Sequence, residues 1–296
     1  MKSLLLGEHR LPTPPAGDPA FAPLEDPRMY WPVQRARLAK TVREGAQSLG
    51  VPVECGLLRL WQYNLPGAAW VERIGLPRRA VELTLGDQLI LHVNPNDLVR
   101  ATHWQGWPHK HRPNSSAFIW DGEWDLRRGD LRQGSRTRFI EDIDAHRDDL
   151  SQSEAFAKYM ARLKAGKPWS SHQQGILLDS EARILTFLKV YLSFMDDMAI
   201  RGFDSTRGKD MLGVAVTREG RLLKINRGLH RLAMAQHLGL PSVPVMVKAV
   251  HRQWWERVVG ETRGQIALDK VGATLRNCVP ESRSGALDPG GVVQAA

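Results

Sequence analysis

The pattern of hydrophobic and polar positions is most regular in the last third of the chain. Leu212–Val216 is an apolar run, Thr217–Gly220 is a polar stretch that ends in glycine, and Arg221–Ile225 has three apolar residues with Arg221 and Lys224 among them. This order predicts a β-hairpin. Apolar residues then recur at helical spacing over Leu229–Leu238, which a glycine follows, and Val243–Val250 predicts a third strand.

Two further helices are predicted upstream of this hairpin. Over Glu154–Leu163 the large apolar residues fall on one face, which is typical of an amphipathic helix. A longer apolar segment from Ser180 to Ile200 is interrupted by charged residues and reaches Gly202, so it predicts a buried helix rather than a membrane span.

The N-terminal region begins with an extended segment and continues with helices. Residues 9–28 contain six prolines. Tyr30–Leu49 has helical spacing, Gly50–Pro52 is expected to end that helix, and Leu57–Tyr63 predicts a shorter one.

The middle of the chain predicts strands and then a long irregular region. In Val81–Val93, apolar and polar residues first alternate, then Gly-Asp follows, and the last part is mostly apolar. This pattern indicates a hairpin or strand pair. Asn94–Asp97 is expected to close the second strand and to cap a short helix near Leu98. Thr102–Arg138 is rich in Trp, Gly, Pro and charge, so we expect a loop-rich insertion.

These elements together predict an α/β (α+β) fold with a small mixed sheet. We expect a mostly helical N-terminal extension over residues 1–80 and a sheet domain over 81–260 that carries a helical insertion at about 101–190. Residues 261–296 form a tail that is expected to be largely disordered, because from Asn277 onward it is rich in Gly, Ser and Pro.

Composition places the chain among globular proteins with an ordinary core. The 296 residues are 42% hydrophobic and 25% charged, and the two cysteines, Cys55 and Cys278, have no metal-ligand spacing. No secretory signal or membrane span is predicted, so we expect a cytoplasmic protein without membrane insertion. The net charge of +9 attracts polyanions, although the basic residues are spread along the chain.

The start of the predicted helix at Leu229 is a candidate phosphate site. A helix N-terminus presents unpaired backbone N–H groups and a positive dipole end, and Gly228 would let an anion approach the backbone closely. His230 and Arg231 add side-chain donors in the first turn. On the residues alone, a purely structural helix start with a solvated arginine is an equal alternative.

The order of these elements resembles the ParB/sulfiredoxin superfamily. The similarity covers roughly residues 81–100 and 191–257, and its most specific part is the Gly-Leu-His-Arg motif at Gly228–Arg231. The resemblance implies a small mixed sheet of that superfamily's type. It also implies that Gly228, His230 and Arg231 contact nucleotide phosphates, with Arg227 adding a charge where the superfamily usually has Asp.

The same motif discriminates among branches of the superfamily. Leu229 stands where sulfiredoxins carry a catalytic cysteine, and His230 differs from the Glu-Arg-Arg of chromosome-partition proteins. The chain is more similar to the free-serine-kinase branch and to other ParB-like proteins. Some of these carry a Gly-Asp/Glu-Trp-Asp motif, here Gly122–Asp125, and a trailing motif that corresponds to His251–Trp254.

The resemblance implies a nucleotide-binding phosphotransferase, kinase-like, that acts on a small hydroxylated molecule. The nucleotide would be ATP, ADP or CTP, with Mg²⁺ bridging its phosphates mostly through water. Phosphoryl transfer usually requires a carboxylate near the nucleophile, and Glu123 or Asp125 is the candidate base. Asn94, Asp97 and His251 are candidates to line the pocket, and no protein metal site is predicted.

Two alternatives belong to other functional classes. One is a ParB-like module that binds DNA or protein and uses nucleotide as a switch. The positive net charge and the insertion rich in aromatic and basic residues favour this alternative. Packing against the core is nevertheless the favoured interpretation of Trp104, Trp107, Trp120 and Trp124. The other is a non-catalytic scaffold. Arg227 favours this alternative, because it stands where the superfamily usually has an acidic residue.

Overall fold

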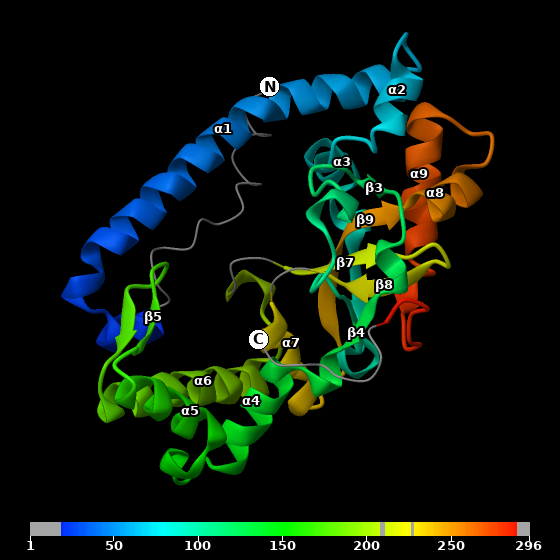
Figure 1. The fold of residues 1–296 in the computed structure, drawn as a ribbon. Coiled ribbons are helices and arrows are strands. Elements are labelled where there is room, and N and C mark those ends of the chain that lie inside the picture. Colours follow the sequence, from blue (N-terminus) through cyan, green and yellow to red (C-terminus); the bar gives the residue numbers. More distant parts are fainter. Residues whose placement is uncertain (1–18, 208–210, 226–227, 289–296) are drawn as a thin grey trace. The chain divides into compact units, whose positions relative to one another are not determined.

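The structure is a computed structural model that describes residues 19–207, 211–225 and 228–288. Its contacts divide the chain into two compact units (Figure 1). One unit combines residues 1–45 with 138–210, and the other combines residues 46–137 with 211–296. We call them the helical unit and the sheet unit. The predicted division into an extension, a domain with an insertion at 101–190 and a tail differs from this one, because the insertion begins only at residue 138.

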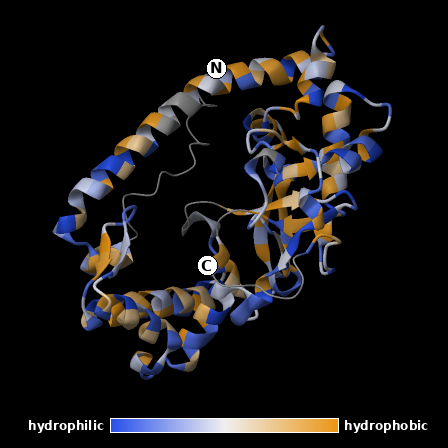
Figure 2. Ribbon diagram, viewed as in Figure 1, coloured by the Kyte–Doolittle hydropathy of each residue, from blue (hydrophilic) through white to orange (hydrophobic). Residues whose placement is uncertain are grey.

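The sheet unit is built on one mixed sheet of eight strands, which confirms the predicted α/β class. Its main path runs in the order β1-β9-β7-β8-β2-β4, while β3 also pairs with β9 and β10 with β8. The bounds are β1 Ile90–Val93, β2 Arg100–Thr102, β3 Ile119–Trp120, β4 Arg128–Asp130, β7 Leu212–Val216, β8 Arg221–Lys224, β9 Val243–His251 and β10 Val279–Pro280. Figure 2 shows that hydrophobic residues concentrate in the central strands.

The register of the central strands defines two ends of the β7–β8 hairpin. The strands are antiparallel, with Val214 opposite Lys224, so β7 begins where β8 ends. We call this the helix-start end, because Gly228 follows β8 there. The turn at Thr217–Gly220 forms the opposite, turn end, where the backbone N–H of Thr217 donates to Arg221. The hairpin and the strand β9 therefore lie where the sequence predicted them.

The helix α7, Leu229–His237, packs its middle against the sheet and is tied to a neighbouring loop. Leu232, Ala233, Met234 and Ala235 are buried. The Gln236 side chain donates to the backbone oxygens of Pro95 (2.9 Å) and Leu98 (3.3 Å). These bonds hold the C-terminal part of α7 against the segment that follows β1.

Four further helices lie entirely within the described part of the sheet unit, and the last corrects the prediction of a disordered tail. They are α2 Ala68–Arg73, α3 Arg78–Leu85, α8 Arg252–Val259 and α9 Gly264–Leu275. The apolar residues of α9, among them Leu268 and Val271, are buried, and β10 then joins the sheet beside β8. The Gly, Ser and Pro content that suggested disorder belongs to the segment after α9.

The predicted strand pair at Val81–Val93 is half wrong. Residues 78–85 form α3, and only Ile90–Val93 is a strand. Val81 and Leu85 are buried, whereas Leu83 between them is 49% exposed. The buried positions are therefore four apart, which is the spacing of a helix face, and the alternation of apolar residues was incidental.

The segment after β1 is also shorter than predicted. Asn94 caps a single 3-10 turn at Pro95–Asp97 by accepting from the backbone N–H of Asn96. No helix begins at Leu98, which is buried and leads into β2. Thr102–Arg138 is loop-rich as predicted, but its strands β3 and β4 pair with β9 and β2, so these residues complete the main sheet.

The helical unit contains the helices that the sequence predicted. They are α5 Glu154–Lys164 and α6 Glu181–Arg201. The helix α4 Ser135–Ala145, which begins in the sheet unit, and the hairpin of β5 Trp169–Ser171 and β6 Ile176–Leu178 were not predicted. Ser180 caps α6 through the backbone N–H of Arg183, and Gly202 ends it. Phe21, Phe187 and Tyr191 are in mutual ring contact in the core of this unit.

The first long helix, α1, is continuous over Tyr30–Gln62. The prediction that it ends at Gly50–Pro52 is therefore wrong, since Pro52 lies inside it. An interior proline costs about 3 kcal/mol because it removes a backbone hydrogen bond. Beyond Pro52, Leu58 and Trp61 are 2% exposed. Their burial offsets that cost and keeps the C-terminal part helical.

Candidate functional site

The N-terminus of α7 has the backbone geometry of an anion site. Gly228 has φ 90° and ψ 13°, which is the left-handed region that favours glycine, and no side chain among the described residues caps the helix. A Cβ at this position would lie 2.7 Å from Leu212 Cδ2. The N–H groups of the first turn have no carbonyl partner within the helix. Because Gly228 has no side chain, an anion can reach these N–H groups without obstruction from that residue.

His230 lies in this first turn and is neutral at pH 7. Burial, together with the smaller effect of the positive charge of Arg136, lowers the pKa of His230 from 6.5 to about 4. Arg136 belongs to the first turn of α4, in the part of that helix that falls in the sheet unit. The site thus combines a helix N-terminus, a neutral imidazole and two arginines, Arg136 and Arg231, of which Arg231 is partly buried.

Lys224 and Arg136 are members of this region that sequence reasoning missed. Lys224 is fully buried at the end of β8, with its ammonium group donating to the backbone oxygen of Ile225. A lysine within an otherwise apolar strand is a signal that could have identified Lys224. Nothing near Arg136 in the sequence connects it with His230, because the fold alone brings its charge close enough to act on the imidazole. Arg227, which was predicted to bind phosphate, lies outside the described residues.

Asp125, predicted as a base, is instead a buried partner of the turn at the other end of the hairpin. Its carboxylate accepts from the backbone N–H of Arg218 (2.9 Å) and from the Arg218 side chain through Nη2 (2.7 Å) and Nε (3.0 and 3.1 Å). Burial alone would raise the pKa of Asp125, but the hydrogen bonds from Arg218 outweigh it and hold that pKa below its usual value. The geometry favours a structural role for this carboxylate.

His251 completes the same cluster. Its Nε2 lies 3.0 Å from the backbone oxygen of Gly122 and 3.7 Å from Oδ1 of Asp125, while Nδ1 accepts from the backbone N–H of Gln253. Its ring contacts Trp124, with centroids 5.9 Å apart. The structure therefore brings the motifs at Gly122–Asp125 and His251–Trp254 together, as a clamp around the β7–β8 turn.

The two groups of predicted site residues lie at opposite ends of the hairpin. Gly228 lies against Leu212 at the start of β7, whereas Asp125 is bonded to Arg218 beyond its end. The four steps of β7 alone advance about 13 Å, since an extended strand rises roughly 3.3 Å per residue. Glu123 is exposed on the same segment as Asp125. The structure does not bring either carboxylate to the helix start.

Asn94 and Asp97 lie at the helix-start end of the sheet, but beside the far part of α7. The loop that contains them is bonded to Gln236. Gln236 is seven residues after Leu229, or about 10 Å along the helix at 1.5 Å per residue. Both residues are exposed. They flank α7 rather than its N-terminus, and His251 lies in the clamp at the turn end.

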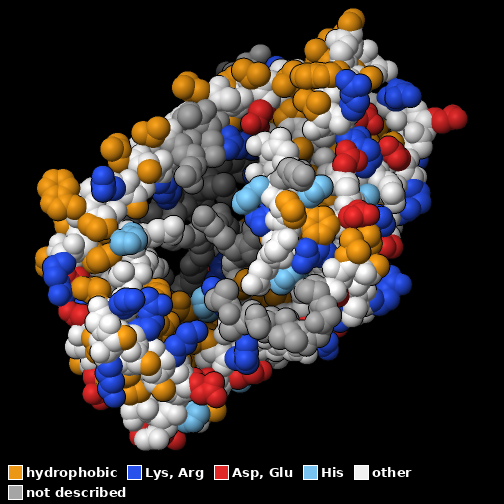
Figure 3. Space-filling model, in the orientation of Figure 1, with side chains coloured by type: hydrophobic (Ala, Val, Ile, Leu, Met, Phe, Trp, Pro, Cys, Tyr) orange, Lys and Arg blue, Asp and Glu red, His pale blue; other side chains and the backbone are white. Residues whose placement is uncertain are grey.

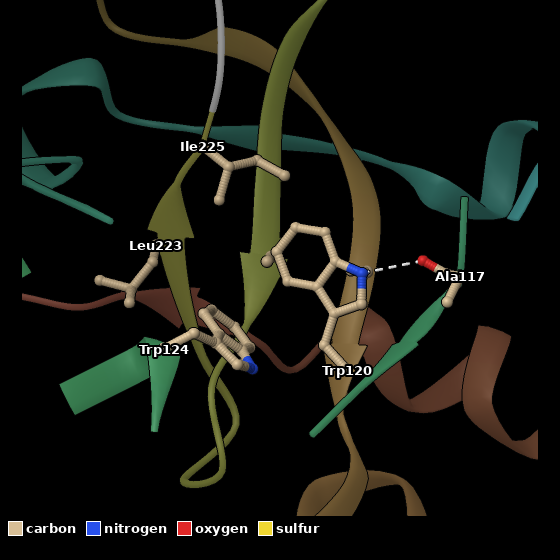
Figure 4. Packing of buried hydrophobic residues seen from close by; sticks show 7 residues of the cluster. Ala117, Trp120, Trp124, Leu223 and Ile225 are labelled. Atoms are coloured by element: carbon tan, nitrogen blue, oxygen red, sulfur yellow. Dashed lines mark hydrogen bonds between the residues drawn. The ribbon is translucent and has the colours of Figure 1, made fainter. Parts of the chain in front are cut away.

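The tryptophans of the irregular region divide into two groups. Trp120 and Trp124 are buried against Leu223 and Ile225, and Trp120 donates to the backbone oxygen of Ala117 at 2.9 Å (Figure 4). These two tryptophans are core residues, as predicted. The remaining two are partly buried and in contact with arginines: Arg112 lies 5.9 Å from the ring of Trp104, and Arg127 lies 5.0 Å from that of Trp107.

Neither metal ligands nor a membrane-spanning element stand out in the described parts of the chain. Within residues 19–207, 211–225 and 228–288, no group of three or more His, Cys, Asp or Glu side chains is arranged to hold a metal ion. No helix of these segments has both the length and the apolarity needed to cross a bilayer. The predicted nucleotide and Mg²⁺ stay predictions.

Comparison with known proteins adds no family assignment. The chain matches no protein-family model, no curated protein and no solved structure. The similarity to the ParB/sulfiredoxin superfamily therefore rests on the sequence motifs, and any function has to be argued from the geometry at the ends of the hairpin.

Proposed function

We propose that this chain binds a nucleotide through its phosphates at the N-terminus of α7. The observation that carries the proposal is the combination of an uncapped, glycine-initiated helix with a partly buried neutral histidine and two arginines. The helix N-terminus and the two arginines favour a bound anion, the neutral imidazole can donate one hydrogen bond to it, and the Gly-Leu-His-Arg motif predicted the same position from sequence.

The bound phosphate would accept hydrogen bonds from the first-turn N–H groups of α7. Arg231 lies in the first turn of α7, and its guanidinium would donate two parallel bonds to the phosphate oxygens, which a lysine could not do. Arg136 contributes a second positive charge from α4. Because Gln236 holds α7 to the loop after β1, these donors do not have to be ordered when the ligand binds.

A divalent cation would be held mainly by the nucleotide itself. Mg²⁺ keeps several water ligands and commonly binds through phosphate oxygens with one or two carboxylates. A site without a cluster of protein ligands is therefore compatible with Mg²⁺-nucleotide. Calcium, which takes six to eight oxygen ligands, would gain little from the residues around α7.

The proposal is limited to binding, since the phosphotransferase prediction lacks a base at the site. Glu123 and Asp125 lie at the turn end of the hairpin, and Asp125 is occupied by Arg218. Phosphoryl transfer depends on a nucleophile held near the phosphate. A kinase activity acting on a small hydroxylated molecule would need a different group than the two that the sequence suggested.

Isothermal titration calorimetry with ATP, ADP and CTP, each with and without Mg²⁺, tests the proposal. We expect at least one nucleotide to bind the wild type, and Arg231→Ala to weaken it about tenfold or more, since a hydrogen bond to a charged group contributes about 1.5–3 kcal/mol. Inorganic tripolyphosphate serves as a second ligand, and its binding would show that the phosphates alone are recognised.

Arg276→Ala is the matched control. Arg276 is an exposed arginine of the sheet unit that follows α9, so its removal changes the net charge equally. It should leave nucleotide affinity within about twofold of wild type, since surface substitutions are usually worth less than about 0.5 kcal/mol. The proposal fails if no nucleotide binds the wild type, or if the two arginine variants lose affinity equally.

A further inference from the structure

The segment that follows β2 leaves the sheet close to the N-terminus of α7. Strand β2 is parallel to β8, with Ala101 opposite Lys224, so both strands end at the helix-start end of the hairpin. Neighbouring strands lie about 4.8 Å apart. Gly228 follows Ile225 by three residues, so their Cα atoms are at most about 11 Å apart. We call the segment after β2, His103–Arg112, the tryptophan loop.

Helix α7 and the tryptophan loop leave this end toward opposite faces of the sheet. Gly228 lies against the side chain of Leu212. Trp104 packs against a cluster that contains Ala215 and Ile225. Successive residues of a strand point to opposite faces, so Leu212 and Ala215, three positions apart, lie on different faces. Parallel strands bind ligands outside their carboxyl ends, where neighbouring connections turn to opposite faces. The ends of β2 and β8 form such a position.

The tryptophan loop is held in place by the arginine at its end. Gly106 has φ 69°, and the backbone N–H of Trp107 donates to the backbone oxygen of Trp104 at 3.1 Å. The Arg112 guanidinium donates to the same oxygen at 2.8 Å and to the backbone oxygen of Trp107 at 3.1 and 3.3 Å. A ligand therefore does not have to order this turn when it binds.

The indole ring of Trp107 has a cation on its face. The guanidinium carbon of Arg127 lies 5.0 Å from the ring centroid, and Nη2 of Arg127 donates to the backbone oxygen of Gln105 at 3.1 Å. Arg127 belongs to the helix-start end, because its backbone oxygen accepts from the backbone N–H of His103. The ring of His111 makes an edge contact with the indole, with centroids 6.1 Å apart. A long charged side chain thus covers the ring face, and a planar ligand could replace it.

Two N–H groups of this pair have no hydrogen-bond acceptor among the described residues. They are Nε1 of Trp107 and Nε of Arg127, and both atoms are shielded from solvent. A buried donor without a partner destabilises the fold. Because both unpaired groups are donors, a ligand that satisfies them has to carry acceptor atoms. Nucleobases and ribose hydroxyls carry such atoms.

The surroundings of the tryptophan loop are basic. Residues 98–120 contain no Asp or Glu, but three Lys or Arg and three His residues. Figure 3 shows histidine side chains together with cationic and hydrophobic ones on the irregular part of the sheet unit. The charge of Asp288 reaches His103, but this carboxylate accepts from the backbone N–H groups of Arg128 and Gly285. The loop therefore favours a ligand that combines a flat ring with negative charge.

We propose that Trp107 is the ring on which the base of a nucleotide stacks when its phosphates bind at the N-terminus of α7. The inference rests on the proposed function, because it concerns the other half of the same ligand. Arg127 turns off the indole, the base takes its place, and the two unpaired N–H groups pair with acceptor atoms of the nucleoside. Stacking tolerates any base, since every base has a π-face. The site thus selects nucleotides over phosphorylated molecules that lack an aromatic ring.

Calorimetric titration of the full chain with ATP and with inorganic tripolyphosphate separates the base from the phosphates. We expect Trp107→Leu to lower the ratio of ATP affinity to tripolyphosphate affinity about tenfold or more, as expected for the loss of one stacked base. Its tripolyphosphate affinity should stay within about twofold of wild type, since the phosphate donors are unchanged. Trp107→Phe keeps an aromatic face and should retain most of the wild-type ratio.

Trp70→Leu is the matched control. Trp70 is a 50% exposed tryptophan of α2 in the same unit, so its substitution should leave both affinities within about twofold of wild type. Intrinsic fluorescence adds a readout that a purely structural role of Trp107 would not change. ATP, but not tripolyphosphate, should quench the tryptophan fluorescence of wild type, and the quenching should be smaller in Trp107→Leu. Circular dichroism would verify that each variant is folded.

The possible failures of the two proposals are distinct. An unchanged affinity ratio in Trp107→Leu, with tripolyphosphate still bound, would overturn the stacking role of Trp107 and leave the phosphate site intact. Equal losses of both ligands in Trp107→Leu and Trp107→Phe would show that Trp107 only supports the fold of the site, which would also overturn its stacking role. Failure of wild type to bind either ligand would overturn the phosphate site and the stacking role together.

Discussion

The two ends of the β7–β8 hairpin both carry arginine and histidine, but in different electrostatic settings. At the turn end, Arg218 is neutralised by the buried carboxylate of Asp125, and His251 lies beside the same carboxylate. At the helix-start end, His230 is kept neutral by burial and by Arg136, another cation. The two ends have similar residue types, but the charge that acts on the histidine is a carboxylate at the turn end and an arginine at the helix-start end.

Under the proposed function, this difference separates a structural site at the turn end from a ligand site at the helix-start end. A buried ion pair whose hydrogen bonds are satisfied internally has nothing left for a ligand, and its removal is felt as lost stability. Cations gathered at a helix N-terminus gain more from an external anion. The comparison therefore predicts that substitutions at the turn end change folding, while those at the helix-start end change binding.

The largest expected effect is that of Asp125→Ala. The side chain is 0% exposed and bonded to Arg218, so its loss removes four hydrogen bonds and should lower the free energy of unfolding by about 3–5 kcal/mol. Urea denaturation would measure this. Under conditions where the variant remains folded, its nucleotide affinity should match wild type, and a selective loss of binding would contradict the division of roles.

A pair of glycine substitutions tests the same division more finely. Gly228→Ala places a Cβ 2.7 Å from Leu212 at φ 90°, and Gly220→Ala places one 2.9 Å from the indole nitrogen of Trp254 at φ 84°. Each should cost about 3 kcal/mol, since a left-handed alanine and overpacking both destabilise. Thermal melting and calorimetry should show similar losses of stability, with nucleotide binding weakened only in Gly228→Ala.

The pH dependence of stability should contain a contribution from His230. Its pKa is about 4 in the folded protein against 6.5 in the unfolded chain, so the unfolded state takes up a proton first as the pH falls. This contribution to stability is present above pH 6.5 and is lost on going down toward pH 4, by about 2 kcal/mol at pH 5. Urea midpoints of wild type and His230→Gln at pH 7.5 and pH 5 would measure it.

The variant should lose less stability than wild type over that interval. Inorganic phosphate should reduce the loss in wild type, because an anion at the helix start favours the protonated imidazole. An identical pH dependence in the two proteins would show that His230 titrates normally.

The smallest expected effect is that of Glu123→Ala. Glu123 is exposed and lies at the turn end with Asp125, so its removal should change stability by less than about 0.5 kcal/mol and leave nucleotide affinity unchanged. Calorimetry and melting would measure both quantities. A large loss of nucleotide affinity would show that Glu123 belongs to the binding site. It would contradict the conclusion that the two ends of the hairpin have separate roles.

Elements with strong local signals were determined by the sequence alone. The helices α5 and α6 and the order β7, β8, α7, β9 all lie where periodicity, caps and glycines predicted them, because these signals act over a few residues. The glycine start of α7 belongs to this class. The continuous α1 and the helical α3 were missed, since burial of Trp61 and Val81 in the tertiary structure outweighed local signals that favoured a break or a strand.

The tertiary structure decided what the polar residues do. Asp125 became the partner of Arg218, which is 93 positions away, and Arg136 came to lie near His230 from another helix. No local pattern encodes such pairs, because they depend on which strands are neighbours in the sheet. The sequence therefore determined where the glycine-initiated helix begins, while only the fold decided that the carboxylates predicted to act there lie at the opposite end of the hairpin, where Asp125 is bonded to Arg218.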